Sequence, residues 1–156
     1  MATYTVTVRW QKENNEDFLK SRYSRAHTWS FDGGIDIPAS SSPHVVPIPM
    51  SIENAVDPEE AFVAGISSCH MLWFLSIAAK SGFVVESYID SAIGKMSKDG
   101  AGKVAITSVT LSPKTKFGGS KQPTRSELEA LHHASHESCY IASSVKSEIL
   151  CHPILE

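Results

Sequence analysis

The sequence contains few cysteines and no large excess of charge of either sign. Three of its 156 residues are cysteine, and 14 lysines and arginines nearly balance 17 aspartates and glutamates, for a formal net charge of −3. So few cysteines, in odd number, exclude a small secreted scaffold held by disulfides, and a reducing cytosol fits best. Without a basic excess there is no electrostatic reason to expect nucleic acid or an anionic membrane as partner. Small molecules or a second copy of the chain are the expected partners.

The sequence also lacks an apolar leader. The first ten residues, "MATYTVTVRW", alternate apolar with polar side chains and contain no apolar core of a signal peptide, so we expect a cytoplasmic protein. One run, residues 61–79, approaches the length of a membrane span, but it includes Ser67, Ser68, His70 and Ser76. A helix buried by protein is therefore the better interpretation of this run, and we expect no membrane partner.

Alternating side chains predict two strands before a long loop. Residues 3–10 form the first strand, and residues 23–31 form the second, which ends at the turn "DGG" of residues 32–34. Arg25 shares a face with the aromatic residues of the second strand, where a guanidinium calls for an anionic partner. The Pro- and Ser-rich residues 35–54 predict an extended surface loop without regular structure, of a kind that usually serves function or packs on a partner.

Two helices follow from their capping residues. The first has Asp57 as N-cap, Pro58 at the first helical position and Glu60 at the capping-box position, and it is expected to end near Gly82. The second begins with Thr124 as cap and Glu127 three residues on. Its predicted buried stripe consists of Leu128, Leu131 and Ala134.

The remaining pattern completes an α+β domain. Residues 84–96 and 104–117, joined by "SKDGAGK", predict a long β-hairpin, and residues 146–152 predict a last strand. The order β, β, loop, α, β, β, α, β is that of one domain over residues 1–156, with two helices packed on antiparallel sheet.

Cysteine is the first candidate for chemistry. Cys69 stands in the middle of the first predicted helix, where a lone cysteine usually packs as a small hydrophobe. Cys139 lies in a second helical segment, "SHESCYIASS", so two helix-borne thiols could meet in the core. We interpret Cys151, in the last strand, as structural or incidental.

The histidines allow a different hypothesis. His132, His136 and Cys139 fall near one helical face, and zinc binds imidazole and thiolate ligands. A fourth ligand such as Cys69 or His70 would have to come from elsewhere. We favour a solvated, histidine-rich helix face over a metal site, and we expect no cofactor.

Residues 57–75, "DPEEAFVAGISSCHMLWFL", resemble the N/D-P-E-E-L/A-F-x-A…A/S-C signature of the OsmC/Ohr family, the osmotically inducible and organic-hydroperoxide-resistance proteins. The segments "AHTWSFDGG" and "HHASHESCYIASSV" extend the resemblance over nearly the whole chain. The resemblance implies an OsmC-like fold, with antiparallel sheets wrapped around two central helices in an intertwined homodimer. Where peroxidase members usually carry "C-P-Y-S" at the second cysteine, this chain has "C-Y-I-A", which indicates a less-characterised branch.

The resemblance also implies a thiol peroxidase that reduces organic hydroperoxides to alcohols. Cys69 matches the peroxidatic cysteine, Cys139 the resolving cysteine and Glu59 the first glutamate after the proline. Arg25 is the best match for the arginine of the family, with Arg22 as the fallback. A structural ion pair inside the dimer is the alternative for Arg25.

A thiolate attacks the peroxide bond, and a guanidinium nearby stabilises it. Attack leaves Cys69 as a sulfenic acid, which Cys139 would convert to a disulfide. An external thiol must then reduce that disulfide, and a dihydrolipoyl group, the donor in the best-known branch of the family, is our hypothesis for it.

Helix geometry bears on Glu59. Ten residues of continuous helix separate it from Cys69 by about 15 Å. Either the helix breaks near Gly65, or the Glu59 and Arg25 that serve a given Cys69 come from a second subunit, which we prefer. Apolar walls around the thiol would admit a greasy hydroperoxide. We expect them from Phe62, Met71, Leu72, Trp73, Phe74, Pro47 and Met50.

The alternative function comes from another class. An OsmC-fold dimer could use the same cavity, without catalysis, to hold an apolar ligand or a metal, with its cysteines acting as redox sensors.

Overall fold

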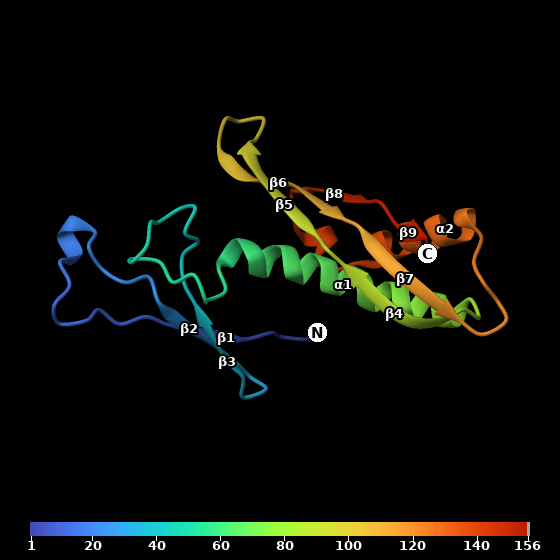
Figure 1. The fold of residues 1–156 in the computed structure, drawn as a ribbon, viewed down its shortest axis with the longest axis horizontal. Coiled ribbons are helices and arrows are strands. Elements are labelled where there is room, and N and C mark those ends of the chain that lie inside the picture. Colours follow the sequence, from blue (N-terminus) through green and yellow to red (C-terminus); the bar gives the residue numbers. More distant parts are fainter. Residues whose placement is uncertain (156) are drawn as a thin grey trace. The chain divides into compact units, whose positions relative to one another are not determined.

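A computed structural model describes residues 1–155 of the chain (Figure 1). Its contacts divide into two compact units, Met1–Ala61 and Phe62–Glu156. The longest helix, α1 (Pro58–Lys80), begins in the last residues of the first unit and continues into the second. The expectation that residues 1–156 form one domain stays a prediction.

The first unit is a three-stranded antiparallel sheet in the order β1-β2-β3. Its strands are β1 (Val6–Arg9), β2 (His27–Phe31) and β3 (Asp36–Ala39), and a 3-10 turn, η1 (Phe18–Lys20), lies between the first two. Both predicted strands are confirmed, but two details were wrong. The second strand begins at His27, so Arg25 precedes it, and the segment expected to be irregular contains β3. The "DGG" turn joins β2 to β3, which explains the extra strand.

This sheet has almost no core of its own. Among residues 1–61, all of which the structure describes, Ala39 is the only hydrophobic side chain that is buried. Val6 and Val8 of β1, which the alternation places on one face, are 52% and 59% exposed. Small sheets need a covered apolar face for stability, so this face calls for a cover from outside the unit.

Helix α1 begins as its capping residues predict. The backbone N–H of Glu60 donates to Asp57 Oδ1 (2.7 Å), and the backbone N–H of Asp57 donates to Glu60 Oε2 (3.3 Å), which is the reciprocal capping box. At the other end Gly82 adopts a left-handed conformation (φ 81°), and the Phe83 N–H closes the last turn on the carbonyl of Ala78.

Only one stripe of α1 is buried. The residues on it are spaced by four, namely Ile66, His70, Phe74 and Ala78. The helix is long and apolar enough to span a membrane by length and composition, and 22% of that window is buried. A core helix of a soluble protein meets the same criterion, and a single such helix is weak evidence for a span. The helix that the sequence predicts is present, and protein buries one stripe of it, while the residues on its other faces are exposed or half-buried.

The second unit contains two three-stranded sheets. The first has the order β4-β7-β9 and comprises β4 (Val84–Asp90), β7 (Pro113–Gly118) and β9 (Ile154–Leu155). The second has the order β5-β6-β8 and comprises β5 (Ile93–Lys98), β6 (Val104–Leu111) and β8 (Glu148–Cys151). The predicted hairpin is confirmed, with each of its long arms divided into two strands.

The sequence analysis expected antiparallel sheets, but two strand pairs are parallel. β8 pairs with β6, and β9 with β7, in parallel register. The reason is the connection, because the chain leaves the hairpin through α2 (Arg125–Ser138) and returns in the direction of the strands it joins.

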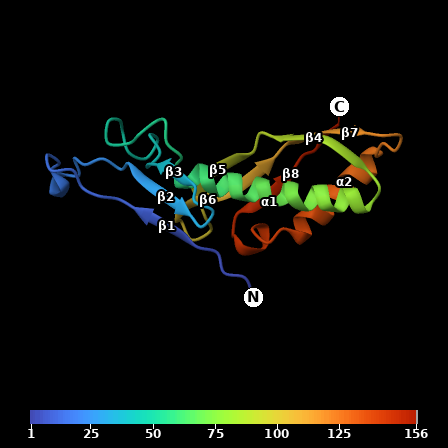
Figure 2. The ribbon, with the colours of Figure 1, turned by 90° about the horizontal axis from the view of Figure 1, so that it is seen from below.

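Helix α2 packs against α1. Its capping box is confirmed, with the Glu127 N–H donating to Thr124 Oγ1 (3.2 Å) and the Thr124 N–H to Glu127 Oε2 (2.8 Å). One core cluster joins the two helices and the start of β4, and it consists of Phe74, Ala78, Phe83, Leu128 and Leu131. Figure 2 shows the two helices lying alongside each other. Cys139 is the C-cap residue of α2 with extended backbone, so the expectation that it stands within a helix was wrong.

A second core cluster fixes the other sheet on α1. It contains Ile66, Val109 and Leu111, with Val63 among the residues packed against it. Gly94 of β5 lies so close to the helix that a Cβ placed there would stand 2.5 Å from Val63 Cγ2. A side chain at this position would have to push strand and helix apart.

We therefore expect Gly94→Ala to lower the free energy of unfolding by about 1–3 kcal/mol, because overpacking forces the backbone to shift. Gly100→Ala is the matched control, since a Cβ at Gly100 meets nothing within 4 Å. Urea denaturation at a fixed protein concentration measures both. Adding Val63→Ala to Gly94→Ala should recover part of the loss, and equal midpoints for both glycine variants would contradict the close approach.

Candidate active site

The structure brings two thiols from distant parts of the chain together. Cys69, in the middle of α1, and Cys139, the C-cap of α2, are 70 positions apart in sequence, yet their thiols lie close enough to influence each other's electrostatics. Both are free thiols. The packing of α2 on α1 produces this contact, because the core cluster of the two helices fixes the end of α2 beside the middle of α1.

The environments of the two thiols differ. Burial, assisted by the hydrogen bond with Cys69, raises the pKa of Cys139 to about 11, although the Ala142 N–H donates to its sulfur (3.4 Å). At neutral pH Cys139 is therefore predominantly a thiol. Cys139 is 1% exposed, whereas Cys69 is only half-buried. Cys69 is the sulfur of this pair that a dissolved reagent can reach.

Two aromatic rings flank the thiols. Trp73 follows Cys69 by one helical turn, Tyr140 follows Cys139 directly, and the two rings meet edge to face with centroids 5.5 Å apart. Tyr140 is the residue that replaces the proline of the family pattern. Phe74, expected in an apolar wall near Cys69, instead lies in the core and stacks on His132 at 4.2 Å. Helical spacing places it on another face of α1 than Cys69.

Arg25 and Glu59, the other predicted catalytic residues, belong to the first unit. The Arg25 guanidinium lies 3.7 Å from the centre of the Tyr23 ring and donates to the Ser21 carbonyl (3.0 Å). It is thus placed among aromatic residues, as the sequence analysis predicted, although outside the strand. Arg22 is exposed.

Glu59 stands in the first turn of α1, half-buried. The helix runs from Pro58 to Lys80 without interruption, so it does not break near Gly65. The roles of Arg25, Arg22 and Glu59 stay predictions.

A second polar cluster, which the sequence analysis missed, lies on the buried stripe of α1. His70 and His132 are 1% and 2% exposed, and their rings stack with Nε2 of His70 3.0 Å from Nδ1 of His132. Cys151 of β8 places its sulfur 3.8 Å from the same Nε2. Burial lowers the pKa of His70 to about 4 and of His132 to about 3, and it raises the pKa of Cys151 to about 12.

The sequence of β8 carries no signal for this cluster, because Ile149, Leu150 and Cys151 are all apolar and do not distinguish an inner face; the structure does. Ile149 and Cys151 are the half-buried residues of that strand, alternating with exposed ones, so Cys151 belongs to its inner face. The partners of that face could not be read from the sequence, because they depend on the parallel pairing of β8 with β6.

Two helices packed with three-stranded sheets, and a thiol pair between the helices, define a thiol-bearing α+β protein of the OsmC type. The family model described as OsmC-like protein matches residues 52–152, and the chain belongs to that family. An OsmC-like protein of unknown function from Vibrio cholerae is 52% identical, with a TM-score of 0.97 over 99% of this chain and 100% of that one.

More distant structures share the fold. The organic hydroperoxide resistance protein OhrB of Bacillus subtilis is 21% identical, with a TM-score of 0.66 over 99% of this chain and 98% of that one. An organic hydroperoxide resistance protein from Elizabethkingia anophelis is 14% identical, with a TM-score of 0.67 over 99% and 97%. A search of curated proteins found no match.

The thiol environments predict an order of chemical labelling. At pH 7.5 iodoacetamide should modify Cys69 well before Cys139 and Cys151, because burial keeps the latter two protonated and thiolates are the reactive form. Peptide mass spectrometry at increasing times measures the order. In urea all three should react at similar rates, which is the control. Labelling of Cys139 as fast as Cys69 in the folded protein would contradict the assignment.

Proposed function

We propose that the protein is a cysteine-dependent peroxidase that reduces organic hydroperoxides. The observation that carries this proposal is the contact between the side chains of Cys69 and Cys139. Two free thiols that interact directly are placed to form a disulfide, which a peroxidatic and a resolving cysteine require. Membership of the OsmC-like family and the fold shared with organic hydroperoxide resistance proteins support the same activity.

The different exposure of the thiols supports Cys69 as the attacking cysteine and Cys139 as the resolving one, because Cys69 is only half-buried whereas Cys139 is 1% exposed. The Cys69 thiolate attacks one peroxide oxygen, the O–O bond breaks, and the alkoxide leaves as an alcohol after taking up a proton. Cys69 is then a sulfenic acid. The sulfur of Cys139 attacks the sulfur of Cys69, its proton leaves with the hydroxyl group as water, and a disulfide remains. A dithiol reductant, for which we propose a dihydrolipoyl group, restores both thiols by exchange and is itself oxidised.

An organic rather than inorganic peroxide fits the apolar surroundings of the thiols. Trp73, one helical turn after Cys69, and Tyr140, which follows Cys139 directly, form an aromatic pair. Leu72, on α1 near Cys69, is 60% exposed. These side chains favour a substrate with an apolar tail over hydrogen peroxide, which gains nothing from apolar contact.

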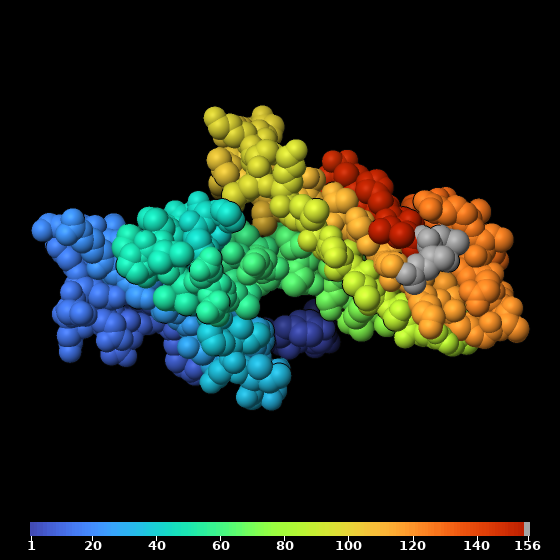
Figure 3. Space-filling view, viewed as in Figure 1, coloured from blue at the N-terminus to red at the C-terminus, as the bar shows by residue number. Residues whose placement is uncertain are grey.

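We propose further that the working form is a homodimer in the cytoplasm. The first unit buries only Ala39 among its hydrophobic side chains, so its sheet is incomplete in a single chain. In the second unit, the tip of the β5–β6 hairpin stands clear of the rest (Figure 3), and Ile93, Met96 and Val104 of its strands are 50–66% exposed. A second copy would cover such surface, and it would let Arg25 and Glu59 of one chain serve Cys69 of the other.

The thiol cycle has a direct test. With dihydrolipoamide as reductant, the protein should consume cumene hydroperoxide faster than hydrogen peroxide, and Cys69→Ser should abolish turnover because the attacking sulfur is gone. Cys139→Ser should complete one turnover and accumulate a sulfenic acid at Cys69. Mass spectrometry after one equivalent of hydroperoxide should find the Cys69–Cys139 disulfide in the native protein.

Ser68→Ala is the control for local damage, since Ser68 is an exposed neighbour of Cys69 on α1. Its rate should match that of the native protein. Thiols that stay reduced under hydroperoxide would reject the enzyme and favour a binding module.

The hypothesis that Arg25 of one chain serves Cys69 of its partner can be tested by mixing variants. Arg25→Ala should slow hydroperoxide reduction roughly a hundredfold, because the cation that stabilises the Cys69 thiolate is lost. Arg25→Ala and Cys69→Ser chains, unfolded together at equal amounts and refolded, should regain about a quarter of the native rate. About half of the dimers are then mixed, and each mixed dimer has one intact site of two.

Arg22→Ala is the matched control and should leave the rate unchanged. No gain on mixing would place Arg25 and Cys69 of one site in the same chain. A larger loss in Arg22→Ala than in Arg25→Ala would transfer the role to Arg22.

A further inference from the structure

We propose that His70, His132 and Cys151 form a zinc-binding site that is separate from the thiol pair. The three residues come from α1, α2 and β8, and one ligand atom from each lies within 4.8 Å of the other two. Imidazole nitrogen and thiolate sulfur are both ligands that zinc binds in proteins. Neither Cys69 nor Cys139 belongs to the group.

The distances suit a tetrahedral ion. At zinc bond lengths of about 2.0 Å to nitrogen and 2.3 Å to sulfur, tetrahedral ligand atoms stand about 3.3–3.6 Å apart. Nε2 of His70 lies 3.0 Å from Nδ1 of His132 and 3.8 Å from the Cys151 sulfur. The ligand atoms of His132 and Cys151 lie within 4.8 Å of each other, so an ion could bind if these two side chains moved closer by roughly an ångström.

The protonation states agree with the geometry. Burial keeps both imidazoles neutral at neutral pH, and a neutral imidazole offers the lone pair that a metal needs. Cys151 is a thiol in the metal-free protein, so zinc binding displaces its proton to solvent and forms the Zn–S bond in its place.

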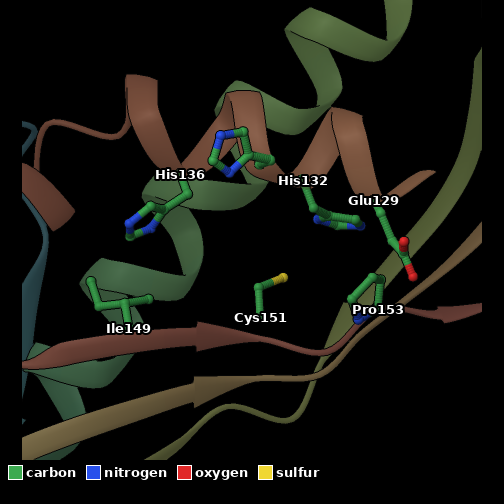
Figure 4. A pocket seen from close by; sticks show the side chains of 7 residues that line it. Glu129, His132, His136, Ile149, Cys151 and Pro153 are labelled. Carbon is green, nitrogen blue, oxygen red and sulfur yellow. The ribbon is translucent and has the colours of Figure 1, made fainter. Parts of the chain in front are cut away.

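A pocket beside the cluster would let the ion enter from solvent and would leave room for a fourth ligand. The pocket has a volume of about 230 Å³, and its lining includes His132, Cys151 and His136. Figure 4 shows the Cys151 sulfur pointing from β8 toward α2, from which His132 and His136 project. With three protein ligands and an opening to solvent, water completes the tetrahedron.

This zinc site departs from the metal hypothesis that the sequence suggested. That hypothesis grouped His132 and His136 with Cys139, whereas Cys139 contacts Cys69 and Cys151 takes the place of the thiolate ligand. The proposal does not depend on peroxidase activity.

The test measures metal content and coordination. The full chain is stripped with a chelator under reducing conditions, reloaded with Zn²⁺, desalted and analysed by elemental mass spectrometry. We expect about one zinc per chain. Reloading with Co²⁺ should give the near-ultraviolet charge-transfer band of a thiolate ligand and the strong visible bands of tetrahedral cobalt.

Variants distinguish this cluster from the thiol pair. Cys151→Ser should lose the zinc and the charge-transfer band, whereas Cys69→Ser should keep both. His152→Ala is the matched control, because His152 is exposed and adjoins Cys151 in sequence. Zinc lost in Cys69→Ser but kept in Cys151→Ser would assign the metal to the thiol pair and overturn the proposal. Less than about a tenth of a zinc per native chain would overturn it too.

Thermal unfolding keeps the test valid if a ligand variant folds poorly. Zinc at a hundredfold excess over its Kd should raise the Tm of the native protein by roughly 5–10 °C. A native Tm that does not respond to zinc would contradict the site whatever the state of the variants.

Discussion

The contact between α1 and α2 is the interaction on which the second unit depends. Phe74 of α1 stacks on His132 of α2, and the leucines of α2 complete the same cluster. Neither helix could bury its apolar stripe alone, so the two stripes specify each other. The same packing determines where α2 ends and thus holds Cys139 against Cys69. The thiol pair is a consequence of the core rather than an addition to it.

The geometry of helix α1 places the neighbouring residues Cys69 and His70 in different environments. Successive residues point about 100° apart, so the half-buried Cys69 and the fully buried His70 face different neighbours although they are adjacent. Cys69 meets the capping end of α2, and His70 meets His132 and Cys151. One helix can therefore carry a half-buried thiol beside a neutral imidazole that faces the interior.

Local chemistry explains which features the sequence could predict. Capping at Asp57 and Thr124, and the alternation in β1, act within a few residues, so both helices and most strands were predicted correctly. The family resemblance added Cys69 and Cys139 as a pair, and the structure brings them into contact. The parallel pairing of β8, and with it the place of Cys151 beside His70, depends on how the chain returns from α2. Cys151 and His70 are 81 positions apart, and no local sequence pattern predicts that the chain returns to this place.

The second unit contains three thiols, so either Cys139 or Cys151 could in principle form a disulfide with Cys69. The proposed peroxidase cycle and the proposed zinc site together explain why it would be Cys139. A sulfenic acid at Cys69 reacts with whichever thiol reaches it, and both Cys139 and Cys151 belong to the same unit. Cys139 is already in contact with Cys69, whereas the sulfur of Cys151 lies 3.8 Å from Nε2 of His70. A zinc ion bound to Cys151 would hold that sulfur at the metal and leave Cys139 as the resolving partner. The metal would then protect the fidelity of the thiol cycle without taking part in it.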